Sequence, residues 1–414
     1  MIEQKEQRKR NTNEQKNTKK LNVSNESLNG QEPQSARVIT NEKKGKEKLK
    51  ITFLGGVGEI GKNMTAFEYK DEIIILDAGL TFPDDDLPGV DIVVPDISYL
   101  VANKSKVKAI VLTHGHEDHI GGLPFLLPEI NVPIYGSRLT LGLVENKLKE
   151  YPKIKAKLIS VKPRNVLKIG SFSIEFIHVN HSIAGALAVC ITTPAGNVVH
   201  TGDFKVDFEA INGQVTDLER FGELGKKGVD LLMCESTNVC RKGYSMSERR
   251  VGETLDRLFN EHKENRLFVA TFASNIHRLQ QIMNLAEKYG RKISFTGRSM
   301  INVSEVAMKL GELKYNKENV IDIDKIDKFA DKELLIITTG SQGEPMSALT
   351  RMAANEFKKI TLGDNDCIII SASPIPGNEK SVYNVINKLF KKGADVIYDE
   401  LADVHASGHA CQEE

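Results

Sequence analysis

Apolar residues occur in short runs separated by polar and glycine-rich stretches, and most runs have the length of a β-strand. Residues 137–150 have the longer periodicity of a helix. Up to residue 240 the pattern predicts the strands 49–54, 64–69, 73–76, 107–112, 133–135, 157–161, 173–176, 197–200 and 230–234. Strands mixed with helices indicate an α/β fold.

A second alternation of helices and strands follows between residues 241 and 365. It predicts the elements 247–261 (helix), 267–272 (strand), 275–289 (helix), 293–295 (strand) and 334–339 (strand). This order fits a small parallel-sheet domain inserted into the first domain. The apolar run 367–371 is expected to return the chain to the first domain. The expected domains are therefore 48–240, an insert at 241–365, and a return segment at 366–414.

Residues 1–47 are rich in Asn, Gln, Lys, Glu and Ser, so they are expected to form a disordered polar tail. Lys plus Arg and Asp plus Glu both number 56, so net charge favours no class of partner. The five cysteines form no CxxC pair, which indicates reduced thiols and a cytoplasmic protein. We expect no membrane association, because no apolar run is long enough to span a bilayer and the N-terminus has no signal-peptide core.

The glycine-rich stretch 55–63, "GGVGEIGKN", resembles two nucleotide-binding motifs. Gly56, Gly58 and Gly61 fit GxGxxG, and Lys62 nearly completes a P-loop, although Asn63 stands where Ser or Thr should be. Both motifs require a helix next, whereas two strand-like runs follow. We therefore predict a glycine-rich turn between strands.

The segment "HGHEDH", 114–119, directly follows the buried strand expected at 107–112. His114 and His116 alternate and can point to the same side, whereas Asp118 and His119 come after the chain has turned. One loop could thus supply ligands to two metal ions. Imidazole with carboxylate suits zinc and similar ions, and a pair of such ions supports in-line displacement. A polar surface loop is the weaker interpretation.

In the segment 114–119 the chain resembles the metallo-β-lactamase superfamily, whose motif is HxHxDH. Lactonases, glyoxalases, lactamases and nucleases share the motif, so it does not define the substrate. The resemblance implies that Asp77 orients the metal loop and that His181, rather than the equally available His178, is the third histidine ligand. It also implies Asp203 as the carboxylate that bridges two ions. The implied ligands are His114, His116, His181 and Asp203 for the first ion, and Asp118, His119, Asp203 and a later histidine for the second.

Further motifs follow in order: "ESTN" at 235–238, "ATFASNIHR" at 270–278, "TTGSQGEP" at 338–345, "SASPIPGN" at 371–378 and "HASGHACQEE" at 405–414. Together they resemble the bacterial ribonuclease J family, in the β-CASP subgroup of the superfamily. The implied fold is a metallo-β-lactamase αββα sandwich with an inserted β-CASP α/β domain.

The resemblance also implies an activity. It is a zinc-dependent 5′–3′ exoribonuclease and endonuclease, active in rRNA maturation and mRNA decay, in which two metal ions hold the hydroxide that attacks the phosphodiester. The cofactor would be two Zn²⁺ ions per subunit, with Mn²⁺ as a substitute. The partners would be single-stranded RNA with a 5′-monophosphate, and further copies in a homodimer or homotetramer, together with a paralogue or an RNA degradosome.

Catalytic and substrate-binding roles follow from the same resemblance. Glu235 and His409 correspond to the acid/base pair. Contacts to RNA are implied for Ala273, Ser274, Asn275, His405, Ala406, Ser407, Gly408 and His409. From the residues alone, the segment around Asn275 could equally be an ordinary helix cap.

The family has a last zinc ligand, a histidine, further along than Glu414. We therefore expect the chain to be truncated and its second metal to lack a protein ligand. The alternative function is a catalytically impaired RNA-binding subunit or fragment. Hydrolysis of small esters, lactones or thioesters is a third possibility, against which the insert and the "HASGH" segment argue.

Overall fold

The computed structural model describes residues 47–83, 87–375 and 377–414. Apart from residue 47, the polar tail expected at 1–47 lies outside the described residues. The described chain contains three β-sheets, of which the first two form one layered domain and the third forms another.

The first sheet has six strands in sequence order, antiparallel from β1 to β3 and parallel from β3 to β6. Its strands are β1 (Lys50–Gly55), β2 (Met64–Tyr69), β3 (Glu72–Leu76), β4 (Val107–Val111), β5 (Ile134–Gly136) and β6 (Leu158–Ser160). Because β2 directly follows the glycine-rich stretch and pairs antiparallel with β1, the predicted turn is confirmed. The helix that a nucleotide-binding motif needs is replaced there by a strand.

The second sheet has the order β11-β10-β9-β8-β7. Its strands are β7 (Val166–Ile169), β8 (Phe172–His178), β9 (Leu187–Thr193), β10 (Gly196–His200) and β11 (Leu231–Met233). One buried cluster contains Ile74 and Val111 from the first sheet with Phe176 and Val189 from the second. The two sheets therefore pack face to face.

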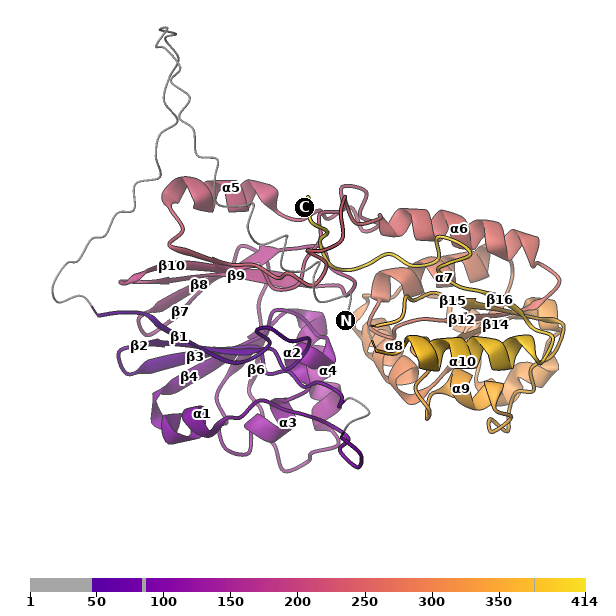
Figure 1. Ribbon diagram of the computed structural model, residues 1–414, viewed down its shortest axis with the longest axis horizontal. Helices are drawn as coiled ribbons and strands as arrows, with labels where there is room; N and C mark the ends of the chain where they lie inside the picture. Colours follow the sequence, from indigo (N-terminus) through magenta and orange to yellow (C-terminus); the bar gives the residue numbers. More distant parts are fainter. Residues whose placement is uncertain (1–46, 84–86, 376) are drawn as a thin grey trace, which may run out of the picture. The chain divides into compact units, whose positions relative to one another are not determined.

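Helices cover the outer faces of this pair of sheets (Figure 1). On the first sheet these are α1 (Ser98–Ala102), α2 (Glu117–Ile120), α3 (Leu123–Leu126) and α4 (Arg138–Leu148), and on the second it is α5 (Leu218–Lys227). Alternate residues of one strand serve the two layers, because Ile75 packs toward the helices while Ile74 packs between the sheets. The predicted αββα sandwich is confirmed.

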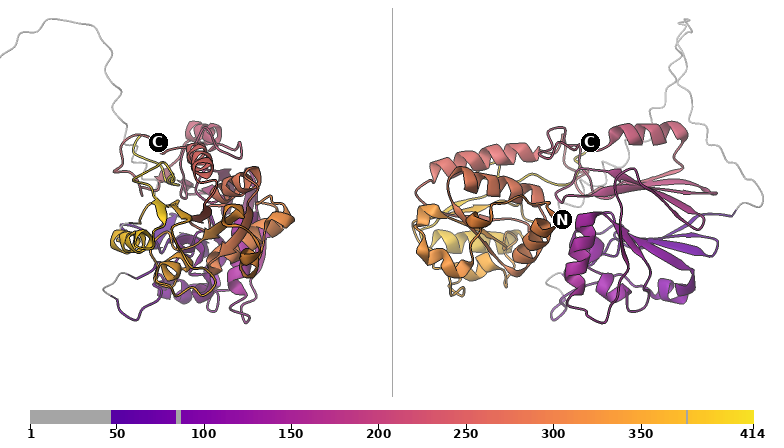
Figure 2. Two further views of the ribbon diagram at one scale, coloured as in Figure 1. Left: turned by 90° about the vertical axis from the view of Figure 1, so that its right-hand side faces the viewer. Right: turned by 180° about the vertical axis from the view of Figure 1, so that it is seen from behind.

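The third sheet is wholly parallel, with the order β13-β14-β12-β15-β16. Its strands are β12 (Arg266–Ala270), β13 (Lys292–Thr296), β14 (Leu334–Thr338), β15 (Asp366–Ile370) and β16 (Asp395–Ile397). Helices lie on both faces, as Figure 2 also shows from behind. They are α6 (Glu248–Glu261), α7 (Ile276–Lys288) and α8 (Arg298–Leu310) on one face, with α9 (Ala348–Ala353) and α10 (Glu379–Phe390) on the other.

The position of β15 differs from the boundary expected at residue 366. Instead of joining the first domain, β15 lies between β12 and β16 in the parallel sheet. Its five residues are all buried, because helices cover both faces of this sheet. The sheet of the inserted domain thus extends to β16, and the return segment begins after Ile397.

Candidate metal centre and substrate site

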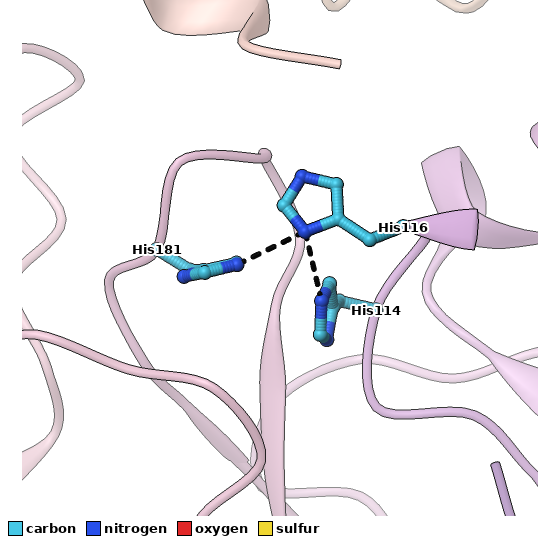
Figure 3. A group of neighbouring side chains, drawn as sticks. All are labelled: His114, His116 and His181. Atoms are coloured by element: carbon cyan, nitrogen blue, oxygen red, sulfur yellow. Dashed lines mark hydrogen bonds between the residues drawn. The ribbon is translucent and has the colours of Figure 1, made fainter. Parts of the chain in front are cut away.

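Three imidazoles meet at one point, two from the loop after β4 and the third, His181, from the segment after β8. The chain is extended through His116 and then turns into α2, so His114 and His116 face the same point. Nδ1 of His116 lies 3.0 Å from Nε2 of His114 and 3.1 Å from Nε2 of His181 (Figure 3). The structure therefore unites the first three histidines implied by the resemblance. His178 lies apart from this cluster, and its Nε2 is buried without a hydrogen-bond partner among the described residues.

Asp203, which follows β10, joins these histidines to the second half of the loop. Its Oδ2 lies 3.4 Å from Nε2 of His119 and 3.8 Å from Nε2 of His114. Asp118 lies further out, with its carboxylate 3.5 Å from Nε2 of His119. The ligand atoms of His114, His119 and Asp203 all lie within 4.8 Å of one another. Asp203 thus occupies the central position that a bridging carboxylate requires.

Asp77 fixes the start of the loop from a buried position at the end of β3. Its carboxylate accepts hydrogen bonds of 2.8 Å from the backbone N–H and from the hydroxyl of Thr113. The same carboxylate lies 2.8 Å from Nδ1 of His119, which leaves Nε2 of that ring to face Asp203. Asp77 adopts a left-handed backbone conformation, with φ of 59°. These contacts hold Thr113 and the ring of His119 in place, and the orienting role of Asp77 toward a metal stays a prediction.

The donor set and its spacing fit a zinc-like cation. Two nitrogen atoms that bind one tetrahedral zinc ion at roughly 2.0–2.1 Å lie about 3.3 Å apart. The observed separations of 3.0 and 3.1 Å around His116 are close to that value. A second convergent group consists of His181, Asp203 and His409. His409 thus also lies near Asp203, with 3.9 Å between its Nδ1 and Oδ2. It is not the later histidine ligand of the family, which the resemblance places beyond Glu414.

The electrostatics of the cluster keep His114, His116 and Asp203 in the form that binds a cation, whereas the carboxylates of Asp203, Asp118 and Asp77 outweigh burial and hold the pKa of His119 well above its usual range. Burial holds the pKa of His114 well below its usual range and lowers the pKa of His116 to about 4. These rings are thus neutral at neutral pH and keep a lone pair for a cation. Burial alone would raise the pKa of Asp203, but the charge of His119 outweighs it and holds that pKa well below its usual range. Asp203 is accordingly an anion.

Glu235 and His409, the implied acid/base pair, are in direct contact. Nδ1 of His409 lies 3.0 and 3.1 Å from the two carboxylate oxygens of Glu235. Burial lowers the pKa of His409, but the hydrogen bond to Glu235 and the charge of Asp203 outweigh that effect and raise it. Glu235 also accepts a hydrogen bond from the backbone N–H of Phe204, next to Asp203. The pair is therefore fixed beside the metal-binding cluster.

The rest of the 405–409 segment is tied to its surroundings. The carbonyl of Gly408 accepts a hydrogen bond from Nδ1 of His181, at 2.7 Å. The hydroxyl of Ser407 accepts one from Asn238, at 2.8 Å. His405 and Ala406 contact the guanidinium of Arg278. These hydrogen bonds fix the position of residues 405–409 relative to the metal-binding cluster.

Asn275 caps the N-terminus of α7, which is the ordinary role that the sequence alone also allowed. It is buried, and its side chain accepts a hydrogen bond of 3.1 Å from the backbone N–H of Arg278. Ala273 packs against the apolar core and Ser274 is half-buried beside it. Asn275 also lines a pocket next to the cluster. The pocket residues are Asn180, His181, Ser182, Lys205, Asp207, Ala210, Ile211, Asn212, Glu248, Asn275, His277, Ala406 and Ser407.

Three residues at the site were not predicted from the sequence. Asn63 contacts Asp118 and His119 through its Nδ2, Thr113 binds Asp77, and Asn238 binds Ser407. Asn63 belongs to the glycine-rich turn and Asn238 to "ESTN". The only sequence signal for Asn63 and Asn238 is that each belongs to one of the motifs named above. Their partners are more than fifty positions away in the chain, so the sequence does not show these contacts.

Comparisons with known proteins agree with this architecture. Residues 57–222 match the family model for the metallo-β-lactamase superfamily, and residues 264–389 match the model for the ribonuclease J β-CASP domain. Ribonuclease J of Thermus thermophilus is 47% identical over 374 residues, which cover 88% of this chain and 65% of that protein. Ribonuclease J of Synechocystis sp. is 47% identical over 369 residues, covering 88% and 58%.

A solved structure supports the fold alone. A protein of unknown function from Enterococcus faecalis V583 is 19% identical, with a TM-score of 0.63 over 88% of this chain and 90% of that one. The fold and the cluster of histidines with Asp203 define a metallo-β-lactamase-type protein with a candidate metal centre and a β-CASP domain. Within that class, the chain belongs to the ribonuclease J family.

The chain spans about two thirds or less of the length of the two ribonucleases J cited above, 65% and 58% respectively. Among the helices that the structure describes, none is both long and apolar enough to cross a membrane.

Proposed function

We propose that this chain is a metal-dependent ribonuclease that binds single-stranded RNA and hydrolyses its phosphodiester bonds. The observation that carries the proposal is the convergence on Asp203 of the histidine cluster and of the Glu235–His409 pair. The pocket next to this point shares His181 with the cluster and Ser407 with the 405–409 segment. Substrate contact, metal ligation and proton transfer can thus take place within one small volume.

Each group has a proposed role. His114, His116, His181 and Asp203 would hold one ion, and Asp118, His119 and Asp203 a second. Bound there, the ions would supply an activated water and neutralise charge on the phosphate. His409, held by Glu235, would deliver a proton to the leaving 3′ oxygen. Ala273, Ser274, Asn275 and the 405–409 segment would hold the RNA, and Asp77 the metal loop.

The finer features of the proposal rest on membership of the family. They are zinc as the metal, with manganese as a substitute, 5′–3′ exonuclease activity with some internal cleavage, and a preference for a 5′-monophosphate. The biological role would be rRNA maturation and mRNA decay in the cytoplasm. Assembly as a homodimer or homotetramer, and association with a paralogue or a degradosome, belong to the same proposal.

The test uses the 414-residue chain loaded with zinc or manganese. Its substrates are two RNAs of one sequence, both labelled at the 3′ end, one with a 5′-monophosphate and one with a 5′-triphosphate. A 3′-labelled RNA distinguishes the modes of cleavage, because a 5′–3′ exonuclease leaves no labelled fragments of intermediate length when it is processive. We expect release of mononucleotides, faster from the monophosphate.

Other outcomes are equally informative. Labelled fragments of discrete length from both RNAs would indicate an endonuclease. RNA binding without any hydrolysis, in either metal, would contradict the proposed activity and favour an RNA-binding subunit. Hydrolysis of a lactone or thioester faster than RNA would assign the site to small esters.

A further inference from the structure

Arg278 is wholly buried at the carboxyl edge of the parallel sheet, where the strand order reverses. The chain continues from β12 to β13 and β14 on one side and to β15 and β16 on the other. In open α/β sheets, the crevice at such a reversal is where ligands bind. Here the chain itself occupies it, because the hydroxyl of Ser371 donates a hydrogen bond of 2.6 Å to the carbonyl of Val404.

All five N–H groups of Arg278 have an acceptor. Nε and Nη2 donate to the two carboxylate oxygens of Glu248, at 2.7 and 2.8 Å, so the pair is bidentate. Nη1 binds the carbonyl of Ser371 at 2.7 Å. The remaining two N–H groups bind the return segment, at Nδ1 of His405, 3.0 Å away, and at the carbonyl of Ala406, 3.3 Å away.

The residues just after Ala406 are those that reach the metal-binding cluster. Ser407 lines the pocket, Gly408 binds His181, and His409 binds Glu235. Only one residue separates Ala406 from Gly408, so we expect a displacement of the Ala406 carbonyl to move the Gly408 carbonyl as well. The guanidinium therefore connects the inserted domain to the hydrogen bond that orients His181.

We propose that Arg278, held by Glu248, is a positioning residue that sets the place of residues 405–409 against the metal-binding cluster. The importance of that placement for catalysis rests on the proposed ribonuclease function. A lysine cannot take over this task, because it has three donors on one atom and lacks the planar fork. A contribution to stability does not by itself explain the Arg278–Glu248 pair, since apolar side chains can often replace a buried ion pair without loss of protein stability.

The same sheet offers a matched control. Arg266 binds Asp366 with the same two-point geometry, Nε to Oδ1 at 2.7 Å and Nη2 to Oδ2 at 2.9 Å. This pair joins the first residues of β12 and β15, at the opposite end of the strands from Arg278. Its contacts in the described structure are to residues 327–366 and Phe268, not to the return segment.

The experiment compares Arg278→Lys with Arg266→Lys in the full chain at equal metal content. Hydrogen exchange is followed in peptides covering residues 403–411, and kcat on RNA is measured per folded molecule. We expect Arg278→Lys to speed exchange in these peptides and to lower kcat about 100-fold, as a small misplacement of catalytic groups can do. Arg266→Lys should speed exchange only near its own strands and keep kcat close to wild type.

If Arg278→Lys does not fold, the variant Glu248→Gln tests the same proposal, because it weakens the pair from the other side. It leaves the three other acceptors of Arg278 in place, and we expect the same local change to a smaller extent. Wild-type exchange at 403–411 together with wild-type kcat, in either variant, would overturn the proposal. So would exchange that rises evenly over the chain. If the wild-type chain cleaves no RNA, the proposed function fails, while the exchange comparison still decides whether Arg278 positions the segment.

Discussion

The backbone carbonyl of Gly408 accepts a hydrogen bond of 2.7 Å from Nδ1 of His181, although the two residues lie 227 positions apart. A carbonyl oxygen can only accept, so the proton of this imidazole is on Nδ1. Nε2 is then unprotonated and faces His116 and Asp203. The return segment thereby selects the form of His181 that can bind a metal.

Replacing Gly408 with alanine should weaken this arrangement. A Cβ at this position would lie 2.8 Å from atoms of Ser182, so the segment would have to shift and the hydrogen bond to His181 would lengthen. We expect metal affinity to fall about 10- to 100-fold, the usual cost of losing such a supporting contact. Competition with a chelating dye measures it. Gly363→Ala, with no atom within 4 Å of its Cβ, is the control. Equal affinities in the two variants would contradict the role given to Gly408.

Asp77→Asn tests the support of the metal loop. Asparagine tolerates the left-handed conformation of Asp77, so the backbone should be kept. Its amide, however, cannot accept hydrogen bonds from Thr113 and His119 on both sides, because the NH₂ group would meet a donor. We expect metal affinity and kcat to fall by about 10- to 100-fold. Isothermal titration with zinc checks the affinity, and a wild-type value would show that Asp77 only supports the turn.

Glu235→Gln tests the proposed acid/base pair. The amide keeps the shape but removes the charge beside His409, so proton delivery to the leaving oxygen should slow. We expect kcat to fall about 100-fold or more, with RNA affinity nearly unchanged.

Glu117→Gln is its matched control. Glu117 belongs to the same "HGHEDH" segment as the ligands, but its carboxylate pairs with Lys147 at 2.7 Å. This variant should keep the wild-type kcat. If both glutamate variants lose kcat equally, the effect comes from charge near the loop and not from the pair with His409.

Glu414 predicts a pH dependence of stability. Burial would raise the pKa of its carboxyl group, but hydrogen bonds from the backbone N–H groups of Cys411, Val206 and Ser245 outweigh this and lower it. A lowered pKa in the folded state means that the stabilisation is present above the unfolded-state pKa and is lost as the pH falls through the folded-state value. Glu414→Gln should therefore lower the unfolding temperature at neutral pH, and the difference should vanish in acid. A difference independent of pH would contradict this assignment.

The ends of strands, and the ligands that follow them, could be predicted because they are local features. The apolar run before His114 and the alternation of His114 with His116 are visible in a few residues, and the structure has them as expected. The choice of His181 over His178 needed the family pattern, because both stand near the end of the same strand.

Features that depend on pairing between distant segments could not be predicted. The apolar strand β15 suits either sheet by its sequence, and only its pairing with β12 and β16 assigns it to the inserted domain. The contacts of Gly408 with His181 and of Arg278 with His405 join residues more than a hundred positions apart. A motif reveals such residues without revealing their partners.

The most direct test of the central claim is RNA hydrolysis by the wild-type chain and by Asp203→Asn, each with zinc and with excess chelator. The substitution keeps the shape of the carboxylate at the centre of the cluster and removes its charge. We predict hydrolysis by the wild type with zinc only, and none by the variant, with unchanged circular dichroism in both. Hydrolysis by the variant at the wild-type rate, or by the wild type in chelator, would contradict the assignment of a metal-dependent nuclease site to this cluster.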